Sequence, residues 1–216
     1  NHLLYFYPEI KNFLTKELID KYSSQIDENF EEKRLKGEND SYICELIRND
    51  SIKEFVTYVN KTNTSITGCI NESFYETNRL LVKNGETTLI EYAAFFGSIQ
   101  IFQYLRLNNI QLYPNLWTFV IHGRNPELIH LLEGDKIEAP NNNDFKKCLR
   151  ESIRCHHNEI KEYIQNNYII DEKEKSFDFY SNVFDFYDFS LIQSDFVNQS
   201  SFYFLCKNDF YVLVDL

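Results

Sequence analysis

The chain contains no methionine and only one tryptophan, so other large side chains must fill its core. Of its 216 residues, 15 are tyrosine and 19 are phenylalanine. No stretch approaches the roughly 18 consecutive apolar residues that indicate a membrane-crossing helix. We therefore expect a folded protein with a core rich in aromatic rings and with no membrane partner.

Basic residues are also scarce. The chain has 22 lysines and arginines against 33 acidic residues, which gives a net charge of −11. Sequence-independent binding of nucleic acid requires a basic surface that neutralises phosphates, so the charge argues against a nucleic-acid partner. Residues Asn1–Tyr7 are apolar but lack the basic flank and the cleavage site of a signal peptide.

The five cysteines are odd in number and scattered, a pattern typical of free thiols in a reducing compartment, so we expect a cytoplasmic protein. The tightest group of potential metal ligands is Cys148, Cys155, His156 and His157. This group lacks the close cysteine pairs of structural zinc sites, and Cys148 is expected in the core. We therefore expect no metal site and no other cofactor.

No motif assembles residues for catalysis. His122, next to Gly123, could act as a general base, but no serine or cysteine stands near it in the sequence. The sequence also contains no glycine-rich phosphate loop. We expect no catalytic residue and no enzyme activity in this chain.

The most informative segment present is Thr88–Leu105, which predicts two short helices separated by a stop. Ala93 and Ala94 would let one helix approach a neighbour closely, and Gly97 suits the positive φ that closes a helix. The apolar stripe of a second helix follows at Ile101, Phe102 and Leu105. Two such helices cannot bury their apolar faces alone, so the pattern implies stacked copies.

Weaker copies appear when the residue that stops each first helix is aligned. The stop positions are Asp50, Gly97, Gly123, His156, Tyr187 and Asn208. All except Tyr187 are residue types that tolerate the left-handed region best. The aromatic segment 177–189 around Tyr187 is expected to be another first helix, with an exposed aromatic patch or a strand as alternatives.

The pattern resembles the ankyrin repeat, whose motif is Thr-Pro-Leu-His-x-Ala-Ala-x-x-Gly. The residues that match it are Thr88, Ile90, Ala93, Ala94 and Gly97. Leu89 and Glu91 replace the proline and the histidine of the motif. The chain is most similar to the divergent ankyrin domains, rich in Phe, Tyr and Asn, that are expanded in parasitic protists and have no assigned function. The resemblance implies an all-α, ankyrin-like helical solenoid of about five to six degenerate repeats.

The expected organisation has two parts. Residues 1–37 are predicted to form a helical cap or linker, with a helix from about Glu9, a second helix over Ile26–Leu35 and a stop at Gly37. Residues 38–216 form the array, with an insertion at about 62–85 that carries one extra helix over Asn71–Val82. The chain ends inside a repeat, so we expect it to be a segment of a longer polypeptide.

The resemblance also implies a non-catalytic scaffold that binds a protein on the concave face of the array. The first-helix positions expected to be exposed there are Glu91, Phe95, Trp117, Ile121 and Arg154. The expected loop positions are Lys83, Tyr113, Asn115 and Asn143. Trp117 is either an interface hot spot or a packed core ring. The acidic chain favours a partner with a basic patch. The alternatives are a regulatory segment of a larger enzyme and a structural spacer.

Overall fold

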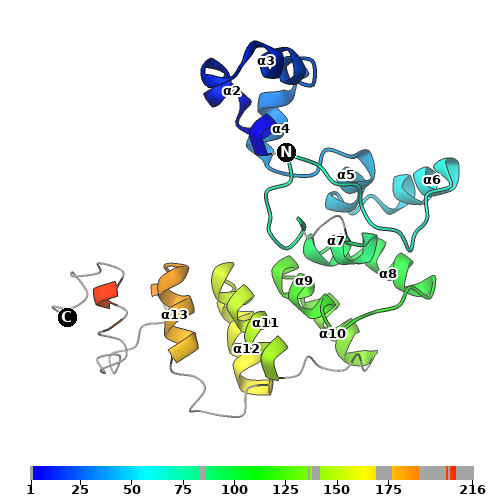
Figure 1. Cartoon of the computed structure of the whole chain (residues 1–216). Coiled ribbons are helices and arrows are strands. Elements are labelled where there is room, and N and C mark those ends of the chain that lie inside the picture. The colour runs from blue at the N-terminus through cyan, green and yellow to red at the C-terminus, as the bar shows by residue number, and fades with distance from the viewer. Residues whose placement is uncertain are drawn as a thin grey trace. The chain divides into compact units, whose positions relative to one another are not determined.

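The computed structural model describes residues 2–82, 86–135, 137, 142–168, 177–189, 203 and 205–207. Within this part of the chain the fold is all-α, as expected (Figure 1), and its one β-type pairing is an isolated antiparallel bridge between Cys69 and Thr88. The chain divides into two compact units, Asn1–Gln111 and Leu112–Leu216. None of the helices described is long and apolar enough to cross a membrane.

The first unit begins with short helices where a longer one was predicted. They are α1 His2–Tyr5, α2 Tyr7–Ile10, the 3-10 helix η1 Lys11–Phe13, α3 Lys16–Ser23 and α4 Phe30–Lys36. The predicted helix from Glu9 is interrupted at Leu14, whose backbone is extended with ψ 153. The stop at Gly37 is confirmed, because this residue has φ 65 and caps α4.

Two helix hairpins complete the first unit. They are α5 Tyr42–Arg48 with α6 Ile52–Thr62, and α7 Leu89–Phe95 with α8 Ile99–Leu107. Their predicted stops are confirmed, with φ 46 at Asp50 and φ 68 at Gly97. At both turns the stop N–H donates to the carbonyl three residues earlier, and the next N–H donates to the carbonyl five residues earlier. Helix α5 packs on α7, and α6 packs on α8.

The second unit contains two further hairpins and one more first helix. The helices are α9 Leu116–Gly123, α10 Pro126–Gly134, α11 Asn142–Arg154, α12 Asn158–Tyr168 and α13 Phe177–Asp185. The predicted stops at His156 and Tyr187 are confirmed by φ 55 and φ 56, and both repeat the hydrogen bonds of the first unit. Helix α13 confirms that segment 177–189 contains a first helix and rules out the alternative of a strand over Phe177–Asp185. The stop predicted at Asn208 lies outside the described residues.

The stop predicted at Gly123 is wrong by one residue. Gly123 is the last residue of α9, and the left-handed residue is Arg124, with φ 51. The cause lies in the next helix, because Asn125 accepts a hydrogen bond from the Glu127 N–H and Pro126 occupies the first helical position. These two residues fix where α10 begins, so the stop falls at the residue before them.

The insertion contains no helix among its described residues, which corrects the helix predicted over 71–82. Local hydrogen bonds replace it: Ser73 Oγ accepts from the Tyr75 N–H at 3.2 Å, and Asn78 Oδ1 accepts from the Leu80 N–H at 3.0 Å. Such side-chain bonds compete with helical ones and favour turns. Tyr75 and Leu81 are nevertheless buried, so the segment packs as an irregular loop.

Candidate functional site

Two polar clusters occupy matching positions in the two units. When residues are counted back from the observed stops, Arg48 and His122 both lie two residues before a stop. Tyr92 and Glu151 both lie five residues before the stop of the following hairpin. The side chains pair in the same way in each unit, Arg48 with Tyr92 and His122 with Glu151. The fold therefore brings the same two positions of successive hairpins together.

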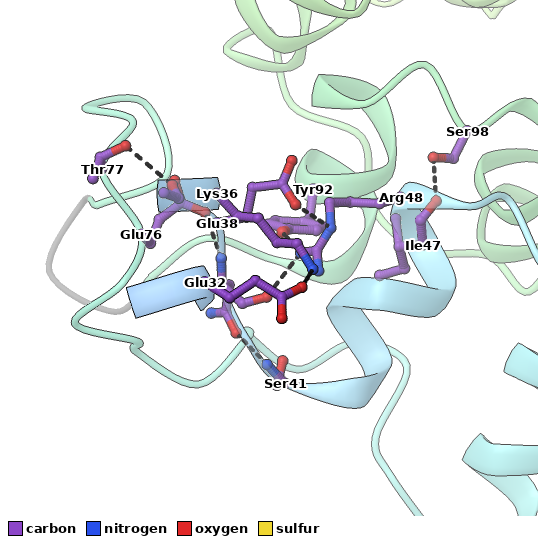
Figure 2. A network of polar contacts seen from close by, with 12 residues as sticks. Glu32, Lys36, Glu38, Ser41, Ile47, Arg48, Glu76, Thr77, Tyr92 and Ser98 are labelled. Carbon is purple, nitrogen blue, oxygen red and sulfur yellow. Dashed lines mark hydrogen bonds and ion pairs between the residues drawn. The ribbon is translucent and has the colours of Figure 1, made fainter. Parts of the chain in front are cut away.

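Arg48 is the centre of the first cluster (Figure 2). Its Nη1 donates to the Tyr92 hydroxyl at 2.7 Å and to the Asn39 carbonyl at 2.8 Å, and its Nε lies 3.0 Å from a Glu38 carboxylate oxygen. The guanidinium also lies over the Phe96 ring, 6.0 Å from its centroid. Burial raises the pKa of Tyr92, so this phenol remains a neutral partner of Arg48.

The same cluster holds the insertion against the connection between α4 and α5. The Asn39 side chain donates to the Asn71 carbonyl at 2.7 Å, and the Thr77 N–H donates to the Gly37 carbonyl at 3.1 Å. The Asn39 N–H donates to a Glu76 carboxylate oxygen at 3.2 Å. Burial raises the pKa of Glu76 above its ordinary value. These contacts all involve backbone groups and join one chain segment to another, so the first cluster is structural.

The second cluster has a different chemical composition. His122 Nδ1 lies 2.7 Å from Glu151 Oε1, and Cys155 Sγ lies 3.3 Å from the same nitrogen and 3.5 Å from the same oxygen. An Arg154 guanidinium nitrogen lies 2.6 Å from Glu151 Oε1. Glu151 is buried, while His122 and Cys155 are half-buried. An imidazole, a carboxylate and a thiol therefore converge on one point.

The electrostatics of the second cluster do not favour a thiolate. Burial acts to raise the pKa of Glu151, but the hydrogen bond from His122 and the charge of Arg154 outweigh it and hold that pKa below its ordinary value. Burial, followed by the Glu151 charge, raises the pKa of the Cys155 thiol to about 12. A catalytic dyad with an orienting carboxylate uses both imidazole nitrogens. Here the carboxylate and the thiol face the same one, Nδ1.

The structure corrects the expected exposure of three of the five first-helix residues, whereas Glu91 and Arg154 are half-buried. Phe95, Trp117 and Ile121 are buried, with 5%, 3% and 1% of their surface exposed. Glu91 forms a capping box with Thr88, in which each side chain binds the other residue's backbone N–H. Arg154 pairs with Glu151. All five side chains therefore have roles within the fold.

The one-residue error at Gly123 explains two of these misplacements. Counted from the observed stop, the positions assigned to Trp117 and Ile121 belong to Thr118 and His122, which are half-buried. Trp117 is the packed core ring of the two alternatives: its centroid lies 6.4 Å from that of Phe145 and 6.0 Å from that of Tyr168. Among the loop positions, Lys83 and the Asn143 side chain lie outside the described residues, and Tyr113 is 56% exposed.

The four potential metal ligands that stand close together in the sequence, Cys148, Cys155, His156 and His157, make contacts with different parts of the fold. Cys148 is buried beside Thr118, the His156 ring lies 3.6 Å from Asp188, and the His157 ring lies 3.2 Å from the Ile121 carbonyl. Only Cys155 reaches a ligand cluster, with His122 and Glu151. His122 and Cys155 are 33 residues apart, which is the period of the predicted repeat. A search for ligands one period apart would have found this pair.

A shallow groove on α5 and α6 is a further surface feature of the first unit, with a volume of about 310 Å³. It is lined by Tyr42, Lys53, Glu54, Thr57, Tyr58 and Lys61. The rings of Tyr42 and Tyr58 meet edge to face at 5.4 Å, and Tyr42 is 52% exposed. Exposed tyrosines beside a groove are residues that partner proteins commonly contact.

Comparisons of the chain with protein-family models, with curated proteins and with solved structures gave no match.

Proposed function

We propose that this chain is an ankyrin-like array of helix hairpins that acts as a non-catalytic, cytoplasmic scaffold for a protein partner. The observation that carries the proposal is the recurrence of one turn geometry. Left-handed residues end the first helices at Asp50, Gly97, Arg124, His156 and Tyr187. A repeated hairpin that buries its faces against neighbours forms an extended surface on which partners can bind.

The second cluster supports a non-catalytic role. A nucleophilic cysteine needs a thiolate at neutral pH, whereas burial and the Glu151 charge raise the pKa of Cys155 to about 12. The regulatory segment of a larger enzyme is the alternative function, and it shares the same binding surface. The acidic chain, with its net charge of −11, favours a partner with a basic patch.

The five first-helix residues are poor probes of this surface, because their side chains have partners or are buried in the fold. Tyr113 replaces them, since it is 56% exposed just before α9, at a loop position that an ankyrin-like array turns toward its partner. Tyr42, 52% exposed at the α5–α6 groove, marks the competing surface. The two tyrosines are matched in residue type and exposure, so each variant is the control for the other.

The test begins with capture of a partner from a native lysate by the full chain, followed by titration calorimetry at low and high salt. We expect Tyr113→Ala to weaken binding by about tenfold or more, the effect of one hot spot, and Tyr42→Ala to leave it nearly unchanged. We also expect affinity to fall as salt rises. Loss of affinity in Tyr42→Ala alone would place the contact at the groove. Unchanged affinity in both variants and at both salt concentrations would contradict the proposal.

A further inference from the structure

The His122, Glu151 and Cys155 cluster has a geometry that the scaffold proposal does not use. Its three ligand atoms lie 2.7, 3.3 and 3.5 Å from one another. They come from α9, from the last turn of α11 and from Cys155, the residue that directly follows α11, all within one unit. From the ligand atoms and their positions we propose that this cluster binds a single divalent transition-metal ion, with zinc as the best fit. The inference is independent of the proposed binding of a protein partner.

The separations between the three ligand atoms agree with tetrahedral coordination of one ion. A tetrahedral zinc ion with bonds of about 2.0–2.3 Å holds neighbouring ligand atoms about 3.3–3.7 Å apart. The two separations that involve Cys155 Sγ, 3.3 and 3.5 Å, already lie in that range. Only the distance between His122 Nδ1 and Glu151 Oε1, 2.7 Å, must lengthen by about 0.6 Å when a metal replaces the shared hydrogen.

The ligand set indicates which ion binds. Imidazole nitrogen, carboxylate oxygen and thiolate sulfur together suit zinc and disfavour magnesium and calcium, which prefer oxygen ligands. On binding, the Cys155 thiol loses its proton to solvent and its sulfur bonds to the metal, while His122 carries its remaining ring proton on Nε2. A water molecule fills the fourth position. The carboxylate and the thiolate together balance the two positive charges of the ion.

Arg154 is the group that opposes the metal. Its guanidinium binds the same oxygen, Glu151 Oε1, at 2.6 Å, and its charge repels a cation. The Arg154 side chain is 28% exposed and lies in the last turn of α11, so it can turn toward solvent when the ion enters. Arg154 therefore competes with the metal, and its removal should strengthen binding. A purely structural role for the cluster predicts no such gain.

The chain offers matched controls for each part of the argument. Cys69 is an exposed cysteine outside the cluster. His130 and Glu133 form another histidine–carboxylate pair, at 3.1 Å, but in the described part of the chain no third metal-ligating side chain joins it. Cobalt bound at that pair would produce no thiolate-to-cobalt charge-transfer absorption, so this absorption shows that a cysteine is a ligand, and its loss in Cys155→Ser identifies Cys155.

The experiment titrates cobalt and then zinc into the metal-free full chain and follows the absorption spectrum. We expect one cobalt per chain with charge-transfer absorption, displacement by zinc, loss of the band in Cys155→Ser and its retention in Cys69→Ser. The zinc affinity should fall by about 100-fold or more in His122→Gln, beyond the range of outer-shell effects, and should rise in Arg154→Gln. An absent band, or a band that persists in Cys155→Ser, would overturn the proposal.

A second measurement covers the case in which Cys155→Ser does not fold, as judged by circular dichroism. The wild-type chain is alkylated with a maleimide with and without zinc, and the modification of each cysteine is followed by mass spectrometry. Zinc should slow alkylation of Cys155 and leave the rate at Cys69 unchanged. Equal rates at Cys155 with and without zinc would also overturn the proposal.

Discussion

The hydroxyl of Ser98 donates a hydrogen bond of 2.5 Å to the main-chain carbonyl of Ile47, and this contact joins two hairpins. Ser98 directly follows the stop of one hairpin, and Ile47 lies three residues before the stop of the preceding hairpin. In the second unit His157 and the Ile121 carbonyl occupy the same two positions, 3.2 Å apart. The same link between neighbouring hairpins is therefore made by different side chains.

The first prediction tests the energetic value of this link. Ser98→Ala removes a buried hydrogen bond, and the Ile47 carbonyl still accepts the Asp50 N–H at 2.9 Å. Because no acceptor is left unsatisfied, we expect the free energy of unfolding to fall by about 1 kcal/mol in urea denaturation. Ser24→Ala is the control, since Ser24 makes a similar bond to the Lys21 carbonyl at an exposed site. An equal change in the free energy of unfolding for the two substitutions would mean that the Ser98 bond adds no more stability than an exposed one.

The second prediction compares two glycines. Gly97 has φ 68, so Gly97→Ala places a Cβ in the left-handed region and should destabilise the protein by about 1–2 kcal/mol. Gly134 lies in the last turn of α10 with no atom within 4 Å of an added Cβ. Gly134→Ala should therefore stabilise by up to about 1 kcal/mol. The melting temperature should therefore fall in Gly97→Ala and rise in Gly134→Ala. A change of the same sign in both variants would mean that Gly97 is not left-handed.

The third prediction concerns Trp117, which is buried between aromatic rings and has an indole N–H without a hydrogen-bond partner among the described residues. Trp117→Ala should lower the free energy of unfolding by about 3–5 kcal/mol, the cost of removing a large core side chain. The exposed Tyr113→Ala should change it by less than about 0.5 kcal/mol. A Trp117→Ala variant as stable as the wild type would show that the Trp117 side chain is not buried in the core.

The fourth prediction is a pH dependence at Glu133, which accepts hydrogen bonds from the hydroxyls of Tyr163 and Tyr168. Burial acts to raise the pKa of Glu133, but these hydrogen bonds and His130 outweigh it, so the pKa lies below the ordinary 4.5. The folded state then holds the proton more weakly than the unfolded state. The carboxylate therefore adds stability above about pH 4.5, which is lost as the pH falls through the lowered pKa.

Urea denaturation of Glu133→Gln checks this dependence. Near pH 7 the variant should be about 1–2 kcal/mol less stable than the wild type, because two hydrogen bonds to a charged acceptor are weakened at a partly exposed site. The difference should shrink toward pH 4. Glu162→Gln, at an exposed position of α12, is the control for the loss of one surface carboxylate. A difference that stays constant with pH would exclude the ionised carboxylate as its source.

Several elements of the fold could be predicted from the sequence because local residue chemistry decides them. The stops at Asp50, Gly97 and His156 follow from apolar spacing and from residue types that accept positive φ, whereas the stop at Tyr187 follows from apolar spacing alone. The stop near Gly123 was misplaced because glycine was given more weight than the Asn125-Pro126 helix start. That pair is a stronger signal, since asparagine is a preferred N-cap and proline, which is disfavoured inside a helix, excludes an earlier start.

The sites could be predicted less well, because they depend on contacts between hairpins. Exposure was inferred from position along a first helix, but Phe95 is covered by the neighbours that pack around α7. The convergence of His122, Glu151 and Cys155 requires two hairpins to stack in register, which no local pattern specifies. In the insertion, turns made by the side chains of Ser73 and Asn78 replaced the helix that apolar spacing suggested.

The central claim is that one hairpin geometry recurs along the chain, and backbone φ angles measured by NMR scalar and dipolar couplings test it most directly. The residues to be measured are Asp50, Gly97, Gly123, Arg124, His156 and Tyr187. We predict positive φ at all of them except Gly123, which should be helical with negative φ. Helical φ at two or more of the five stops, or positive φ at Gly123 with helical φ at Arg124, would contradict the account.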